Sequence, residues 1–206
     1  LALITGLLLP ALVQAETAVW NEQSERLELS RFVDYRVESS PISFSRLQAL
    51  PEAEWQQNGS DSVSLGYGSD VYWFRVSLRN ARAAEALTFL EISYPVLDHI
   101  EFYRASAANP EEPLVLGDKQ PFHERPIHHR NFVVPIAIAP DTTETLYLRV
   151  ETTSSMQVPL TLWDQDAFYA AEQSRSMFEG VYYGIVLVMI LYNLFVYMAV
   201  RERSFL

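Results

Sequence analysis

The residues best suited to chemistry in this chain alternate with apolar residues along short segments. In residues 71–78, Trp73 and Arg75 lie on one face of an expected strand and the other face is apolar, because successive side chains of a strand point to opposite sides. The outward side chains of the neighbouring segments complete the set: Trp73, Arg75, Glu91, His99, Glu101, Tyr103, Tyr147, Arg149 and Glu151. Aromatic rings stack on the apolar face of a sugar, and charged groups bind its hydroxyls. The set therefore predicts a site for a carbohydrate or a similar small polar ligand.

The same face has two other interpretations. Alternation turns half of the residues of every strand outward, and Arg beside Glu is an ordinary cross-strand pair. Outward aromatic residues such as Trp73 and Tyr103 would also form an apolar patch for another sensor protein or for a second copy of the chain. The sequence leaves ligand binding, cross-strand pairing and dimerisation open.

A loop rich in His, Arg and Pro is a second candidate site. It contains Pro121, Phe122, His123, Glu124, Arg125, Pro126, His128, His129 and Arg130. Imidazole and carboxylate groups ligate zinc, but the spacing is not that of a zinc motif, and Arg125 and Arg130 place positive charge beside any metal. Prolines stiffen a loop. We therefore expect Arg125 and Arg130 either to contact a ligand or to brace the edge of the fold.

Asp70 marks a third candidate, at a turn that contains Gly66 and Gly68. Its carboxylate is a hard oxygen ligand, so a calcium site in this acidic chain is the alternative to a plain turn. One carboxylate falls far short of the roughly six to eight oxygens that Ca²⁺ takes. Asp70 is therefore only a weak metal candidate, and the sequence predicts no cofactor.

Catalysis is the remaining functional class to weigh. Glu91, Glu101 and Glu151 offer carboxylates of the kind that pair in glycoside hydrolysis. The sequence contains no nucleophile elbow, Ser/His/Asp signature, phosphate-binding loop or paired metal motif. We expect this chain not to be an enzyme.

The elements that must position these residues are short strands separated by Gly, Pro and Asn. The period-two pattern predicts strands at residues 31–37, 63–65, 71–78, 87–94, 99–104, 131–138, 146–151 and 158–162. A short helical turn is expected within residues 43–57, and a helix within residues 164–177. This pattern predicts an all-β domain, a two-sheet sandwich or jelly roll, followed by a C-terminal transmembrane helix.

An apolar stretch precedes the β domain. Residues 1–15 resemble a signal peptide, because an apolar run ends in Val13-Gln14-Ala15, a small-x-Ala cleavage pattern. The alternative is an uncleaved anchor with a short apolar core. Cleavage would leave Glu16 as the first mature residue and would export the β domain.

A longer apolar stretch follows the β domain. Residues 181–200 carry no charge, and at about 1.5 Å per residue they span the roughly 30 Å hydrocarbon core of a bilayer. Arg201 and Arg203 follow at once, which favours a cytoplasmic location for that end. The predicted divisions are a signal peptide at 1–15, a periplasmic sensor domain at 16–163, a connecting helix at 164–180, the first transmembrane helix at 181–200 and the start of a cytoplasmic loop at 201–206. We expect the chain in a bacterial inner membrane, with residues 16–180 in the periplasm.

Composition excludes some partners. The chain has a formal net charge of −11 and no basic run, so nucleic acid and anionic lipid headgroups are unfavourable ligands. It has no cysteine, and the exported domain must therefore be stabilised by burial without disulfides.

Several motifs also resemble a known family in their order along the chain. They are Tyr72-Trp73-Phe74-Arg75, Leu78-Arg79-Asn80, Pro121-Phe122 with Arg125, Arg130-Asn131-Phe132, Leu146-Tyr147-Leu148-Arg149-Val150, Gly180-Val181-Tyr182-Tyr183-Gly184 and Leu191-Tyr192-Asn193-Leu194-Phe195. Over residues 27–206 the chain resembles the bacterial seven-transmembrane receptors with diverse intracellular signalling modules (7TMR-DISM), in their type 2 extracellular domain and the opening of their membrane region.

The resemblance implies a jelly-roll sensor domain similar to carbohydrate-binding modules. It also implies seven membrane helices and a cytoplasmic output such as a histidine kinase or a diguanylate cyclase, which lies outside this sequence. Position by position, it draws attention to Trp73, Arg75, Arg125, Arg130 and Arg149 without saying which bind a ligand and which brace the fold. A calcium-responsive sensor and a protein-interaction module remain the alternative functions.

Overall fold

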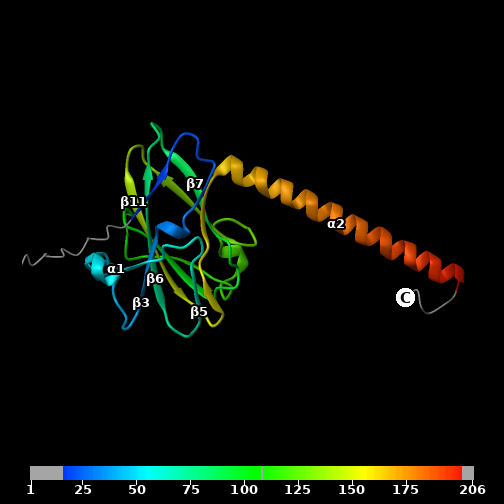
Figure 1. Cartoon of the computed structure of the whole chain (residues 1–206), viewed down its shortest axis with the longest axis horizontal. Coiled ribbons are helices and arrows are strands. Elements are labelled where there is room, and N and C mark those ends of the chain that lie inside the picture. The colour runs from blue at the N-terminus through cyan, green and yellow to red at the C-terminus, as the bar shows by residue number, and fades with distance from the viewer. Residues whose placement is uncertain (1–15, 108, 201–206) are drawn as a thin grey trace, which may run out of the picture. The chain divides into compact units, whose positions relative to one another are not determined.

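The computed structural model describes residues 16–107 and 109–200. The predicted signal peptide, the cytoplasmic loop and its two arginines lie outside the described residues. Two units follow one another along the chain, a β domain that ends at Asp164 and a helical unit that begins at Gln165. Each unit is considered by itself below (Figure 1).

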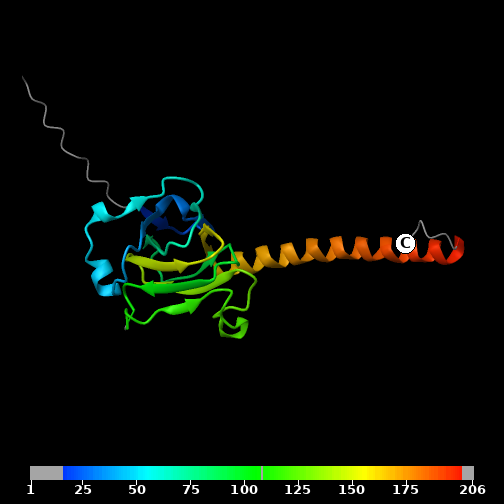
Figure 2. The same ribbon diagram turned by 90° about the horizontal axis from the view of Figure 1, so that it is seen from below.

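The β domain contains three sheets. The largest has the order β4-β3-β6-β11-β8-β9, with β1 added in parallel to the end of β6; the second has the order β10-β7-β13-β2, and the third pairs β12 with β5. The strands of the large sheet are β4 (Gln56–Gln57), β3 (Val33–Val37), β6 (Tyr72–Asn80), β11 (Thr143–Glu151), β8 (His99–Arg104), β9 (Leu114–Leu116) and β1 (Thr17–Trp20). Those of the smaller sheets are β10 (Phe132–Ile138), β7 (Ala86–Ile92), β13 (Leu160–Asp164), β2 (Arg26–Glu28), β12 (Ser155–Gln157) and β5 (Ser64–Tyr67). Figure 2 shows β11, β8 and β9 side by side.

One hydrophobic core joins the large sheet to the four-stranded sheet. Alternate residues of β6, Phe74, Val76 and Leu78, are buried in it together with Leu90 and Ile92 of β7. Period-two alternation puts the apolar set of each strand on one side. The predicted inward face of residues 71–78 is therefore confirmed.

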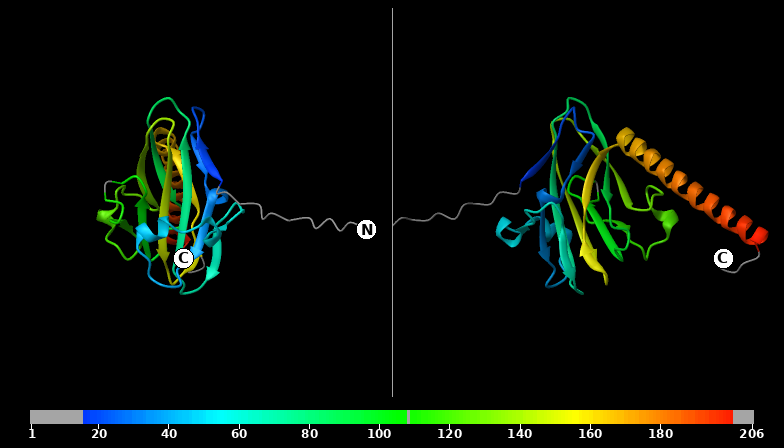
Figure 3. Two further views of the ribbon diagram at one scale, coloured as in Figure 1. Left: turned by 90° about the vertical axis from the view of Figure 1, so that its left-hand side faces the viewer. Right: turned by 45° about the vertical axis from the view of Figure 1, so that its right-hand side comes forward.

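Helical structure in the β domain is confined to short segments. Helix α1 (Phe44–Gln48) lies beside β3 and β6, and single 3₁₀ turns occur at Ser30–Phe32, Glu52–Glu54 and Phe122–Glu124 (Figures 1 and 3). The mostly β architecture confirms the predicted all-β class at this level. The strand at His99–Arg104 has the predicted bounds, whereas β1, β2, β4, β9 and β12, with two to four residues each, were not predicted because they are too short to display a period.

The helical unit is one continuous helix, α2 (Gln165–Val200), of 36 residues. The connecting helix and the membrane span that the sequence predicts are parts of this single helix, which begins directly after Asp164, the last residue of β13. At about 1.5 Å per residue the helix is roughly 54 Å long, well beyond the roughly 30 Å that a bilayer core requires. Its apolar C-terminal half is the part suited to lipid.

Gly117 permits a close approach between two loops. Its φ is +142°, and a Cβ atom built there would lie 2.2 Å from the carbonyl oxygen of Asp98. We expect Gly117→Ala to lower the free energy of unfolding by about 2–4 kcal/mol, through backbone strain and the clash together. Thermal unfolding of the chain in detergent would measure this loss.

Gly59 supplies the control for this prediction. Its φ is also positive, at +60°, but nothing lies within 4 Å of an added Cβ. In Gly59→Ala the free energy of unfolding should therefore fall only by the cost of a positive φ in a residue with a Cβ atom, about 1 kcal/mol. Equal losses in the two variants would contradict the proposed clash at Gly117.

Candidate functional site

Three of the predicted aromatic residues come together on the outer face of the large sheet. Trp73, Tyr103 and Tyr147 lie on the adjacent strands β6, β8 and β11, where Tyr147 is the cross-strand neighbour of Tyr103. The ring centroids of Trp73 and Tyr103 are 5.4 Å apart. The predicted clustering of these rings is therefore present in the structure.

The rings are not open to solvent, because residues 38–57 cover them. In this cover segment, which includes α1 and the Glu52–Glu54 turn, the buried side chains of Phe44, Leu47 and Trp55 pack on the three sheet aromatics. Phe44 stacks on Tyr103 at 4.6 Å and meets Tyr147 edge-on at 5.1 Å. Trp73 is only 1% exposed. A sugar cannot stack on this indole while the cover segment is in place.

Arg75 connects the sheet to the cover segment. Its Nε and Nη2 donate to Asp34 Oδ2 at 3.0 and 2.9 Å, its Nη1 donates to Glu52 Oε1 at 3.1 Å, and its guanidinium lies 4.5 Å from the ring centroid of Trp55. Burial raises the pKa of Asp34 although the hydrogen bonds from Arg75 oppose the shift. In this conformation Arg75 braces the cover segment.

Arg149 has the same role farther along the face. Its Nε and Nη2 donate to the two carboxylate oxygens of Glu38, both at 2.8 Å, and its Nη1 lies 3.4 Å from Glu101. Trp73 Nε1 adds a third donor to Glu38 at 2.6 Å. Hydrogen bonding from Arg149, and secondarily from Trp73, lowers the pKa of Glu38. The hydroxyl of Tyr103 donates to Glu101 at 2.7 Å.

Glu91, another predicted site residue, does not lie on this face. Glu91 belongs to β7 of the four-stranded sheet, where it accepts hydrogen bonds from Asn131 at 2.6 Å and Trp163 at 2.8 Å. The prediction that Glu91 lies on the same face as Trp73 was therefore wrong, because β7 pairs with β10 and β13 and with no strand of the large sheet. The carboxylates considered for catalysis are thus divided between two sheets.

Arg125 lies in the loop before β10. Its Nη1 donates to the carbonyl oxygens of His129 and Arg130 at 2.9 and 3.2 Å, and its guanidinium lies over the rings of Phe122 and Phe132 at 4.9 and 4.5 Å. Burial lowers its pKa. These contacts favour the bracing role for Arg125; a ligand role for Arg125 and Arg130 stays a prediction.

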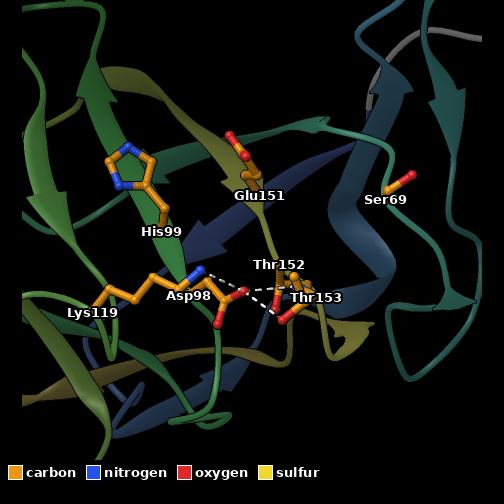
Figure 4. Close-up of a pocket in the computed structure, with 7 residues that line it drawn as sticks. All are labelled: Ser69, Asp98, His99, Lys119, Glu151, Thr152 and Thr153. Carbon is orange, nitrogen blue, oxygen red and sulfur yellow. Dashed lines mark hydrogen bonds and ion pairs between the residues drawn. The ribbon is translucent and has the colours of Figure 1, made fainter.

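An open cavity of about 370 Å³ lies near the Arg149 network. Its walls are Ser69, Asp98, His99, Lys119, Glu151, Thr152 and Thr153 (Figure 4). His99 begins β8 and Glu151 ends β11, and the two residues are cross-strand neighbours. His99 Nε2 lies 3.1 Å from Glu101, and Glu151 lies 4.0 Å from Arg149. The cavity therefore adjoins the charged residues that the sequence predicts as a site.

Asp98 connects two other residues of the cavity wall, Thr153 and Lys119. Its Oδ2 accepts hydrogen bonds from the backbone N–H and the hydroxyl of Thr153, both at 2.8 Å, and lies 3.2 Å from Lys119 Nζ. These bonds, that from the backbone N–H first, lower the pKa of Asp98. Figure 4 shows the three side chains meeting on one side of the cavity, with Ser69 across from them. Asp98, Lys119 and Thr153 were not identified as site residues from the sequence. Ser69 is the exception in part, because it precedes Asp70 in the candidate turn.

The metal sites suggested by the sequence find no additional ligands among the described residues. Among residues 16–107 and 109–200, no group of three or more His, Cys, Asp or Glu side chains is arranged to hold a metal ion. The residues around Asp70 form a short connection between β5 and β6. Calcium at Asp70 therefore rests on the sequence alone.

Helix α2 has the properties of a membrane span. Among the described residues it is the one helix long and apolar enough to cross a bilayer, over Gln165–Ala199. Asn193, a polar side chain within this apolar stretch, donates to the carbonyl oxygen of Met189 at 2.9 Å. The hydrogen bond inside its own helix lowers the cost of placing this amide in lipid.

A β domain followed by such a helix is the architecture of a membrane-anchored protein. The family model described as 7TMR-DISM extracellular 2 matches residues 19–164, and that described as 7TM diverse intracellular signalling matches residues 175–206. The chain belongs to the 7TMR-DISM receptor family, and it contains the extracellular sensory domain and a transmembrane helix. The resemblance seen in the sequence motifs is confirmed. No curated protein matches the chain.

Proposed function

We propose that this domain senses a small polar ligand, a carbohydrate or a molecule of similar chemistry, in the cavity beside the Arg149 network. The observation that carries the proposal is the cavity itself, about 370 Å³ in volume and lined by charged and hydroxyl side chains. Such a site can donate and accept hydrogen bonds along a polyol. In this proposal the site is supported by residues that the cover segment buries against the large sheet: Trp73, Arg75, Tyr103 and Tyr147.

Signalling would follow from a change in the β domain on binding. A ligand that prefers one packing of the cover segment or one arrangement of two copies would shift the population toward it. In this proposal the domain is a jelly roll similar to carbohydrate-binding modules and faces the periplasm of a bacterial inner membrane. The change passes through α2 to a seven-helix bundle and then to a histidine kinase or a diguanylate cyclase outside this chain.

A protein-interaction face around Trp73 and Tyr103 has less support. That alternative needs exposed aromatic rings, and both side chains are buried. Calcium sensing likewise lacks a group of ligands in the described residues.

Thermal unfolding of the full chain in lipid nanodiscs tests the proposed function. A ligand that binds only the folded state raises the unfolding temperature, so the chain is screened against monosaccharides, oligosaccharides, calcium and zinc. We expect a rise with at least one sugar and its loss in a variant whose cavity is blocked from an exposed wall position, Ser69→Trp. A rise only with calcium, or a sugar-induced rise that persists in the blocked variant, would contradict the proposal.

A further inference from the structure

We infer that the cavity selects a hydroxylated ligand that carries a positively charged amine, and that Glu151 is the carboxylate that binds this amine. The inference rests on the proposed function, because it names the ligand class of the same cavity. The chemical class is that of amino sugars and other ammonium polyols.

The hydroxyl groups of the cavity set the polar part of this class. Ser69, Thr152 and Thr153 contribute hydroxyls to its walls, and among the residues that the structure describes no large apolar side chain lines it. A hydroxyl both donates and accepts hydrogen bonds. Thr153 already donates its hydroxyl to Asp98, and Thr152 bonds to Ser154. A polyol can still donate to these hydroxyl oxygens and bond to the exposed Ser69, whereas an apolar ligand offers neither donor nor acceptor.

Two of the charges in the cavity already satisfy each other. Asp98 is held by both donors of Thr153 and lies 3.2 Å from Lys119. The carboxylate and the ammonium together contribute no net charge. Neither is the group that would choose between a neutral and a charged ligand.

Glu151 is the charged group with the weakest internal pairing. Its ion pair with Arg149 is 4.0 Å long and its side chain is 58% exposed. Arg149 is occupied by Glu38, through two hydrogen bonds of 2.8 Å, and lies nearer to Glu101, at 3.4 Å. One guanidinium thus faces three carboxylates, and the negative charge of Glu151 is the least compensated of the three.

The other cationic groups nearby do not change this balance. Arg36 lies 3.9 Å from Glu54 of the cover segment. His99 is turned to Glu101, 3.1 Å away. An incoming ammonium would therefore find in Glu151 a carboxylate at the cavity wall with room to accept it.

An organic ammonium fits these groups better than a divalent metal ion does. A metal needs several ligands around one point, and the described residues provide no group of three metal-binding side chains. An ammonium needs one carboxylate and a few hydroxyl acceptors. The cavity volume of about 370 Å³ leaves space for more than a bare ion.

Calorimetric titration of the full chain in nanodiscs tests the inference with three sugars that share one ring. Glucosamine, glucose and N-acetylglucosamine are compared at a pH at which the free amine is protonated. One charge-assisted hydrogen bond corresponds to roughly a tenfold difference in affinity, so glucosamine should bind about tenfold more tightly than the two neutral sugars. Glu151→Gln should abolish that preference without weakening glucose, and Glu85→Gln, at an exposed position outside the cavity, should retain it.

The salt dependence of binding tests the same point without a variant. Raising the ionic strength should weaken glucosamine binding and leave glucose binding nearly unchanged, because salt screens only the charged pair. Equal affinities for the three sugars, or a preference that persists in Glu151→Gln, would overturn the inference and leave the proposed function standing. Binding of no sugar in this series or in the wider panel would overturn both.

Discussion

Replacing Trp73 with Ala is expected to lower the free energy of unfolding of the β domain by about 3–5 kcal/mol. The indole is 1% exposed and packs against Phe44 and Tyr103, and its Nε1 donates to Glu38 at 2.6 Å. The substitution leaves a cavity under the cover segment and removes one donor from a buried carboxylate. Urea unfolding of the chain in detergent, followed by circular dichroism, would measure the loss.

Tyr67→Ala is the control for this substitution. It also removes an aromatic ring from a strand of the β domain, but Tyr67 is 85% exposed, so we expect a change within about 0.5 kcal/mol. Amide hydrogen exchange in residues 38–57 should accelerate in Trp73→Ala alone, since the cover segment loses its contacts with this ring, the stacking of Phe44 and the hydrogen bond to Glu38. If the two variants unfold alike, the cover segment is not held by this ring.

Arg149→Met should lower the free energy of unfolding by about 2–4 kcal/mol, a range reduced for the partial exposure of the guanidinium. The variant keeps the aliphatic stem but leaves Glu38 and Glu101 without their shared cation. Removing one partner of a buried ion pair is costly because the other charge remains buried. Adding Glu38→Gln to Arg149→Met should recover part of the loss, and a double-mutant cycle isolates the coupling.

The pH dependence of stability provides a second measurement for Arg149. The pKa of Glu38 is lowered in the folded state, so its contribution to stability is present above the pKa of the unfolded chain and is lost as the pH falls through the folded pKa. Acid destabilisation should therefore be weaker in Arg149→Met. Arg79→Met is the matched control, because Arg79 is 53% exposed in its pair with Asp141 and should cost about 0–1 kcal/mol. Equal costs for the two variants would contradict the buried network.

The pattern of the sequence was most informative where strands are long. The alternation in β6 assigned Phe74, Val76 and Leu78 to the core, and the run at His99–Arg104 located β8. Strands of two or three residues, such as β4 and β12, carry no detectable period. Their pairing depends on partners that are distant in the chain.

The candidate site was partly predictable for the same reason. Tyr147 stands opposite both Arg75 and Tyr103 in register, and Arg149 stands opposite both Trp73 and Glu101, so alternation alone placed these side chains on one face. Glu91 alternates in the same way but lies in the other sheet. Strand periodicity identifies the face of a strand and does not identify its sheet.

Taken alone, the sequence determined the β class of the domain, the apolar helix after it, the family and the outward direction of Trp73, Arg75 and Arg149. These follow from local periodicity, hydropathy and motif order, which neighbouring residues encode. Only the tertiary structure decided that residues 38–57 bury the aromatic rings and that a polar cavity opens beside Glu151. Both features are made by segments far apart in the sequence, and their contacts depend on the pairing order of the strands and on long-range packing.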